Sequence, residues 1–132
     1  MPLGQDIIFV LDDDSAVRDS LKFSLEVEGL FVHVCADGPA LIDHPDLRRG
    51  RCLIIDFKMP MMDGFAVLSQ LAAMGLPLPV ILITAHATDS LRRRAAAAGV
   101  RHTLEKPLQD SALLDSIHDV LGPAPSRASG RV

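Results

Sequence analysis

Short apolar runs alternate with amphipathic stretches along this chain, and this alternation constrains the fold more than any other feature. Five runs have the length and composition of strands: Ile7–Leu11, Phe31–Cys35, Cys52–Ile55, Val80–Thr84 and Arg101–Glu105. The first, third and fourth runs are almost continuously apolar, which is typical of parallel strands that helices cover on both faces.

The segments between these runs have the periodicity of amphipathic helices. Their apolar positions are Val17, Leu21 and Leu25; Phe65, Leu68, Leu71 and Ala72; Leu91, Ala95 and Ala98; and Leu113, Ile117, Val120 and Leu121. Each of the four segments is followed by a glycine, a residue favoured where a helix stops: Gly29, Gly75, Gly99 and Gly122. A shorter helix is expected at Ala40–Asp43, after the turn residues Asp37-Gly38-Pro39. Five strand–helix repeats predict an α/β fold, with a doubly wound, five-stranded parallel sheet flanked by five helices.

The composition fits one globular domain and disfavours several classes of function. The 132 residues are 48% hydrophobic and 23% charged, which is the usual range for a globular protein. The net charge of -4 and the absence of Trp and Tyr disfavour direct binding of nucleic acid. The apolar runs are too short to span a bilayer, and the start of the chain, MPLGQDIIFVLDDD, lacks the basic segment of a signal peptide. We therefore expect a cytoplasmic protein that binds neither nucleic acid nor a membrane.

Two further expectations concern the cysteines and the ends of the chain. Cys35 and Cys52 each lie in a strand-like run, which favours buried free thiols over a disulfide or a metal site. We expect the folded domain to cover residues 1–121. The segment GPAPSRASGRV, residues 122–132, is rich in Pro, Ser and Gly and is expected to be a flexible tail.

Polar residues follow four of the five strand-like runs. They are Asp12, Asp13 and Asp14 after the first run, Asp56 after the third, Thr84 at the end of the fourth and Lys106 after the fifth. Each has an ordinary explanation alone: a helix cap, a β-branched strand residue or a solvated charge. Because the carboxyl ends of parallel strands share one edge of a sheet, however, we expect these side chains to lie together there.

Such a group of side chains has the chemistry of phosphoryl transfer. Clustered carboxylates repel one another unless a cation lies among them, and Mg²⁺ prefers carboxylates, water and phosphate oxygens as ligands. Phosphoryl transfer depends mainly on positioning and on charge neutralisation by a metal, a lysine and hydrogen-bond donors. A carboxylate can itself accept the phosphoryl group and become an aspartyl phosphate.

The segments VLDDDSAVRDSL, LIIDFKMPMMDG, VILITAH and EKP, in this order and spacing, resemble the receiver domain of two-component response regulators. The resemblance extends from about Ile7 to Leu121 and is strongest to FixJ-type receivers. It implies a flavodoxin-like sheet of strand order 2-1-3-4-5. It also implies a phosphorelay in which a histidine kinase or a histidine phosphotransfer protein donates the phosphoryl group, Mg²⁺ is the cofactor, and phosphorylation switches a protein-binding surface.

The resemblance also implies a metal site and a phosphoacceptor. Asp56 matches the phosphoacceptor. Asp12 and Asp13 match the acidic pair that holds Mg²⁺ together with Asp56. The backbone carbonyl of Lys58 completes the protein ligands, so the Lys58 side chain is expected to point outward.

Thr84 and Lys106 match the hydroxyl and the ammonium group that contact the phosphoryl group. The Lys106-Pro107 peptide bond is cis in such domains. One position departs from the family pattern: three residues before the lysine, receivers usually have Tyr or Phe, and this chain has Thr103. The aromatic part of the usual switch is therefore missing, so the resemblance does not extend to the transmission of the signal to the last helices.

Other polar residues have two interpretations each. Arg92, Arg93 and Arg94 point in three directions on a helix, so a solvated surface is favoured over a nucleic-acid patch, with a protein contact as the alternative. His86 either tunes the attack of water on an aspartyl phosphate or is an ordinary loop residue.

Two alternatives to a phosphorylated receiver compete with it. A receiver-like module that works without phosphorylation is disfavoured by the complete acidic set and Lys106. A Mg²⁺-dependent phosphohydrolase commonly has a second Asp two residues after its nucleophile, where this chain has Lys58. We therefore expect a phosphoacceptor that assists its own phosphorylation and dephosphorylation, not an enzyme. The output is either a separate protein target or a linked domain, as in a receiver fragment of a DNA-binding transcriptional regulator.

Overall fold

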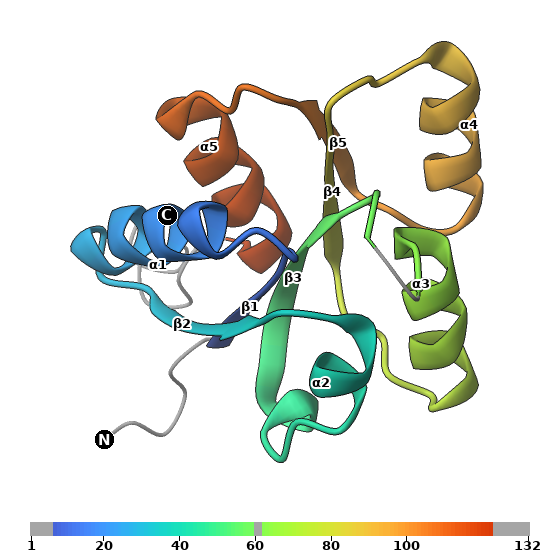
Figure 1. Ribbon diagram of the computed structural model, residues 1–132, viewed down its shortest axis with the longest axis horizontal. Coiled ribbons are helices and arrows are strands. Elements are labelled where there is room, and N and C mark those ends of the chain that lie inside the picture. The colour runs from blue at the N-terminus through green and yellow to red at the C-terminus, as the bar shows by residue number, and fades with distance from the viewer. Residues whose placement is uncertain (1–6, 60–61, 123–132) are drawn as a thin grey trace, which may run out of the picture.

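Five parallel strands form the central sheet of the computed structural model, which describes residues 7–59 and 62–122 (Figure 1). The strands are β1 (Ile7–Leu11), β2 (Phe31–Cys35), β3 (Gly50–Asp56), β4 (Val80–Thr84) and β5 (His102–Glu105). Their order is β2-β1-β3-β4-β5, and every neighbouring pair is parallel. The predicted strand order is therefore confirmed, and the winding reverses between β1 and β3, where such folds bind ligands.

The helices cover both faces of this sheet. They are α1 (Ser15–Val27), α2 (Gly38–Ile42), α3 (Gly64–Ala73), α4 (Asp89–Ala97) and α5 (Asp110–Leu121). α1 and α5 lie on one face, and α2, α3 and α4 lie on the other (Figure 1). The four glycines predicted to end helices all have positive φ, which favours glycine over other residues: Gly29, Gly75, Gly99 and Gly122.

Side chains alternate between two hydrophobic cores along each buried strand. On the face of α1 and α5, the core includes Ile8, Val10, Ile54, Ile81 and Ile83. On the opposite face, the core includes Phe9, Leu11, Leu53, Ile55 and Leu82. All ten side chains are fully buried, and burial of each contributes about 1.5–3 kcal/mol. The two cores explain why these strands are apolar at consecutive positions.

The structure differs from the sequence-based prediction at the borders of several elements. β3 begins at Gly50, two residues before the predicted start, because the Gly50 backbone pairs with Ile7 without contributing an apolar side chain. β5 begins at His102, one residue later than expected, although the Arg101 N–H still donates to the Val80 carbonyl at 2.8 Å. A short 3₁₀ helix at Leu47–Arg49 was not predicted.

Some expectations lie outside the described residues. These concern the first six residues and the tail from residue 123 onward. The predicted domain limits and the flexibility of the tail therefore stay predictions. Both cysteines are free and buried, as expected. Among the helices of the described part, none combines the length and hydrophobicity needed to cross a membrane.

Candidate functional site

Asp56 is the last residue of β3 and brings a carboxylate to the carboxyl edge of the sheet. It pairs with Ile83 of β4, and the next residue, Phe57, donates its N–H to the Ile83 carbonyl at 2.9 Å. The Asp56 side chain is almost buried, and its Oδ1 accepts a hydrogen bond from the Lys58 N–H at 3.2 Å. The strand ladder therefore fixes the direction in which this carboxylate projects.

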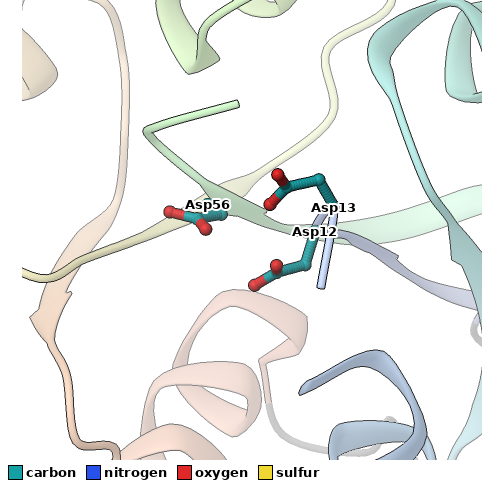
Figure 2. Close-up of side chains that lie close together, drawn as sticks. All are labelled: Asp12, Asp13 and Asp56. Carbon is teal, nitrogen blue, oxygen red and sulfur yellow. The ribbon is translucent and has the colours of Figure 1, made fainter. Parts of the chain in front are cut away.

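Asp12 and Asp13 follow β1, the neighbouring strand. Asp12 is fully buried, and its Oδ1 accepts a hydrogen bond from the Asp14 N–H at 2.9 Å. Asp13 is exposed. Figure 2 shows the carboxylates of Asp12, Asp13 and Asp56 around a common space at the ends of the two strands. One oxygen of each carboxylate lies within 4.8 Å of one oxygen of the other two.

This donor set fits a hard divalent cation. Oδ2 of Asp12 is buried and has no hydrogen-bond partner within the described residues. A buried carboxylate oxygen without a hydrogen bond is costly, and a bound cation lowers that cost. Three carboxylate oxygens at this separation are the ligands that Mg²⁺ or a similar ion prefers.

Lys106 reaches the same carboxylates from the end of β5. Its Nζ lies 3.2 Å from Oδ2 of Asp56 and 3.6 Å from Oδ2 of Asp12. Its backbone N–H donates to the Thr84 carbonyl at 2.8 Å, which anchors the residue beside β4. The Lys106-Pro107 bond is cis, as predicted.

The charges in the site shift two pKa values. Burial of the Asp12 carboxyl raises its pKa, and the nearby carboxylates of Asp56 and Asp13 add to this effect; the Asp14 N–H and Lys106 oppose it. Burial acts to lower the pKa of Lys106, but the carboxylates of Asp12 and Asp56 outweigh it and raise that pKa. Lys106 therefore stays protonated and partly neutralises the acidic cluster.

Thr84 ends β4 beside Asp56, and its side chain is nearly buried. Its Oγ1 accepts a hydrogen bond from the His86 N–H at 3.3 Å and donates to the His86 carbonyl at 3.4 Å. A cavity of about 600 Å³ extends from Asp56 and Lys106 past Thr84 and His86 to Arg94. The hydroxyl is therefore turned toward its own loop, next to an open space beside the phosphoacceptor candidate.

The start of α3 packs closely against the end of β3. The Gly64 N–H donates to the Phe57 carbonyl at 2.9 Å, and a Cβ at residue 64 would lie 3.2 Å from the Phe57 Cα. Asp63 caps α3, because its Oδ1 accepts a hydrogen bond from the Ala66 N–H at 2.9 Å. The Asp63-Gly64 pair thus has a structural role in supporting Asp56. The Lys58 side chain is exposed, as predicted.

Two arginines contact the site region in ways that the sequence did not indicate. Arg18, one turn into α1, donates to the Asp12 carbonyl at 2.8 Å and so helps to hold the acidic pair. Arg92 donates to the carbonyls of Ala87 and Thr103. No spacing pattern identifies such bonds, because they depend on where a long side chain lies after the helices have packed.

The three consecutive arginines point in different directions, as predicted. Arg92 faces β5, and the Arg94 guanidinium lies 4.2 Å from the centre of the Phe65 ring. Arg93 is exposed, and its side chain has no hydrogen bond or ion pair within the part of the chain that the structure describes. Of the three arginines, Arg93 alone fits the prediction of a solvated surface, because Arg92 and Arg94 contact other parts of the domain.

A doubly wound sheet of this order, with three carboxylates and a lysine at its carboxyl edge, defines a receiver domain. The family model for the response regulator receiver domain matches residues 8–118. The chain belongs to this family, and it is a phosphorylatable receiver of the two-component type.

Known proteins and structures agree with this assignment. The chain is 36% identical over 115 residues to the transcriptional regulatory protein FixJ of Bradyrhizobium diazoefficiens, covering 86% of this chain and 56% of that protein. It is 32% identical over 123 residues to the response regulator protein TodT of Pseudomonas putida, covering 93% of this chain and 54% of that protein. The chain thus spans about half the length of these relatives.

Among solved structures, the crystal structure of FixJ-N has a TM-score of 0.80 at 31% identity and covers 89% of this chain and 94% of its own. The response regulator StyR has a TM-score of 0.83 at 32% identity and covers 97% of this chain and 65% of its own. Receiver domains of this family bind Mg²⁺ at an acidic pocket, and membership implies a histidine kinase as the general class of partner.

Proposed function

We propose that this domain accepts a phosphoryl group on Asp56 from a phosphohistidine on a histidine kinase or a histidine phosphotransfer protein. The observation that carries the proposal is the pair of contacts from Lys106 Nζ to Asp56 and Asp12, beside a buried Asp12 oxygen without a hydrogen bond. In this arrangement one ammonium group faces several carboxylates, so the site has excess negative charge. A bound cation would balance that charge and allow an anionic phosphoryl group to enter.

The reaction is a transfer between two nucleophiles. A carboxylate oxygen of Asp56 attacks phosphorus, the P–N bond of the phosphohistidine breaks, and the imidazole leaves with the electron pair of that bond. The product is an acyl phosphate on Asp56. Hydrolysis returns the carboxylate when water attacks phosphorus and the P–O bond to Asp56 breaks.

The residues around Asp56 position and neutralise the phosphoryl group. Lys106 supplies an ammonium group that stays protonated and already lies 3.2 Å from Asp56. Thr84 supplies a hydroxyl that can exchange its bonds to His86 for a bond to a phosphoryl oxygen. These roles agree with phosphoryl transfer as a reaction governed by positioning and charge.

Four protein ligands are proposed for Mg²⁺: the carboxylates of Asp12, Asp13 and Asp56 and the backbone carbonyl of Lys58. When bound, the ion neutralises charge on the carboxylates and on the transferred phosphoryl oxygens. Arg18 and the Asp14 N–H hold Asp12 in place through its carbonyl and its Oδ1. The single exposed carboxylate, Asp13, gives the ion a route from solvent.

We further propose that the domain is a switch and not an enzyme that turns over external substrates. It would assist its own phosphorylation and dephosphorylation, and its phosphorylated form would act on a protein target or on a linked output domain. The name of its relative FixJ, a transcriptional regulatory protein, supports a transcriptional output.

Incubation with Mg²⁺ and acetyl phosphate, followed by intact mass measurement, tests the proposal. The native protein is expected to gain one phosphoryl group, and Asp56→Asn is expected to gain none. No gain in the native protein, together with no binding of beryllofluoride, would favour a module that works without phosphorylation. Continuous turnover of phosphoesters would instead favour a hydrolase.

A further inference from the structure

Arg92 connects the loop after β4 to the edge strand β5 through one guanidinium group. Its Nε donates to the Ala87 carbonyl at 3.3 Å, and its Nη1 donates to the Thr103 carbonyl at 3.1 Å. Ala87 lies in the loop between β4 and α4, whereas Thr103 lies in β5. A single planar group therefore joins two backbone segments on different elements.

The position of Arg92 on α4 explains how it reaches both carbonyls. α4 begins at Asp89, and Thr88 caps it by accepting a hydrogen bond from the Leu91 N–H at 3.1 Å. The Arg92 N–H donates to the Thr88 carbonyl at 2.9 Å, so the residue lies in the first turn. Side chains on a helix lean toward its N-terminus, which directs the Arg92 side chain back over the loop.

The same loop holds the Thr84 hydroxyl. Both hydrogen bonds of Thr84 Oγ1 are made to the backbone of His86, one residue before Ala87. A Thr84 hydroxyl that turns to a phosphoryl group on Asp56 must give up these bonds. The loop at residues 85–88 then loses the restraint that Thr84 provides, so the Ala87 carbonyl can move relative to β4.

The sheet itself does not extend to this loop. The pairing of β4 with β5 ends at Thr84 and Glu105, and Leu82 pairs with Thr103. Ala87 therefore lies beyond the last paired residues, and the guanidinium of Arg92 is a separate link from the loop to β5. Among the described residues that line the cavity beside Asp56, Thr103 is not included. The contact between Arg92 and Thr103 is made through the Thr103 backbone carbonyl.

We propose that Arg92 is a positioning residue that couples the loop after Thr84 to β5, so that phosphorylation of Asp56 displaces β5 through the Thr103 carbonyl. This inference rests on the proposed function, because it needs an acyl phosphate or its mimic at Asp56. The rigid fork of the guanidinium is essential to it, since an ammonium group on a flexible chain does not hold two carbonyls in a fixed geometry.

Three variants separate the fork, the charge and the helix surface. Arg92→Gln removes the charge and shortens the side chain, and Arg92→Lys keeps the charge without the fork. Arg93→Gln removes the same charge from the adjacent exposed position on α4 and is the matched control. All three changes are on the exposed surface, and thermal melting checks that each variant is folded.

The measurement is the change in backbone amide NMR shifts when Mg²⁺ and beryllofluoride are added to each protein. In the native protein and in Arg93→Gln, we expect shift changes in residues 85–88 and at Thr103. In Arg92→Gln and Arg92→Lys, the changes in the loop remain while the change at Thr103 falls severalfold. The affinity for beryllofluoride should also rise about two- to tenfold in both Arg92 variants, since the net contribution of one hydrogen bond no longer opposes loop movement.

A Thr103 shift change of native size in Arg92→Gln, or in Arg92→Lys, would overturn the coupling through the guanidinium fork. An equal loss in Arg93→Gln would overturn it as well, because the effect would then come from helix charge. Failure of the native protein to bind beryllofluoride would contradict the proposed function itself, and with it the coupling through Arg92. The two failures are therefore distinguishable in one set of spectra.

Discussion

Nζ of Lys106 lies 3.2 Å from Oδ2 of Asp56, and the two residues are 50 positions apart in the chain. The contact is possible because β3 and β5 flank β4 and all three strands end at one edge of the sheet. It places a cation, which phosphoryl chemistry needs for charge neutralisation, beside the carboxylate that would carry the phosphoryl group.

Replacement of Lys106 should weaken the binding of a phosphoryl mimic. Lys106→Met removes a hydrogen bond to a charged group, so the affinity for beryllofluoride in Mg²⁺ is expected to fall about ten- to a hundredfold. Titration followed by NMR or calorimetry measures this change. Lys22→Met, which removes a half-exposed lysine that contacts Glu26 and the Val32 carbonyl away from the site, is the control and should bind as the native protein does.

Mg²⁺ should stabilise the folded domain, because the folded state brings together carboxylates that lie apart in the unfolded chain. At a concentration a hundred times its Kd, the ion adds about 2.7 kcal/mol to the free energy of unfolding. Thermal melts in Mg²⁺ and in EDTA test this prediction. An unchanged melting temperature in the native protein would contradict the metal site.

Asp12→Asn should have opposite effects with and without the ion. In EDTA the variant is expected to melt at a higher temperature than the native protein, because it removes a buried charge that Asp56 and Asp13 repel while Lys106 keeps its pair with Asp56. Addition of Mg²⁺ should raise the melting temperature of the variant much less than that of the native protein, because the variant lacks one ligand. Asp19→Asn, on the exposed face of α1, should respond to Mg²⁺ as the native protein does.

Gly64→Ala should disturb the support of Asp56. The added Cβ would lie 3.2 Å from the Phe57 Cα, so the start of α3 and the end of β3 must separate slightly. We expect a loss of about 1–3 kcal/mol in the free energy of unfolding and slower phosphorylation by acetyl phosphate. Ser69→Ala, on the exposed face of α3, is the control. It should leave the free energy of unfolding and the rate of phosphorylation close to their native values.

Acid should destabilise the domain partly through His33. The pKa of His33 is lowered from 6.5, mainly by burial of its imidazole and next by the neighbouring His44. Lys22 and Arg49 lower it further, and Asp46 opposes them. The unfolded chain therefore binds a proton more readily, and stability is lost as the pH falls from about 7.5 to about 5.5. In His33→Phe, which keeps a ring at this position, urea unfolding at these two pH values should show a smaller loss. An equal loss in both proteins would show that His33 does not contribute.

Much of this fold is predictable because its signals are local. The strands β1, β2 and β4 have the predicted borders, since each is an apolar run buried along its length or bounded by turn residues. The start of β3 was predicted less accurately, because the backbone pairing of Gly50 does not require an apolar side chain, and the 3₁₀ helix at Leu47–Arg49 was not predicted.

The convergence of Asp12, Asp56 and Lys106 is predictable from the parallel topology, which places strand ends at a common edge. The bonds of Arg18 to the Asp12 carbonyl and of Arg92 to the Thr103 carbonyl are not. They depend on the path of long side chains after packing, and no residue spacing specifies a backbone carbonyl as a partner.

Chemical trapping of the phosphorylated residue tests the central claim most directly. After reaction with Mg²⁺ and acetyl phosphate, borohydride reduces an acyl phosphate to an alcohol, and peptide mass spectrometry then locates the reduced side chain. The account predicts reduction at Asp56 alone. Reduction at Asp12 or Asp13, or phosphorylation that borohydride does not trap, would contradict it.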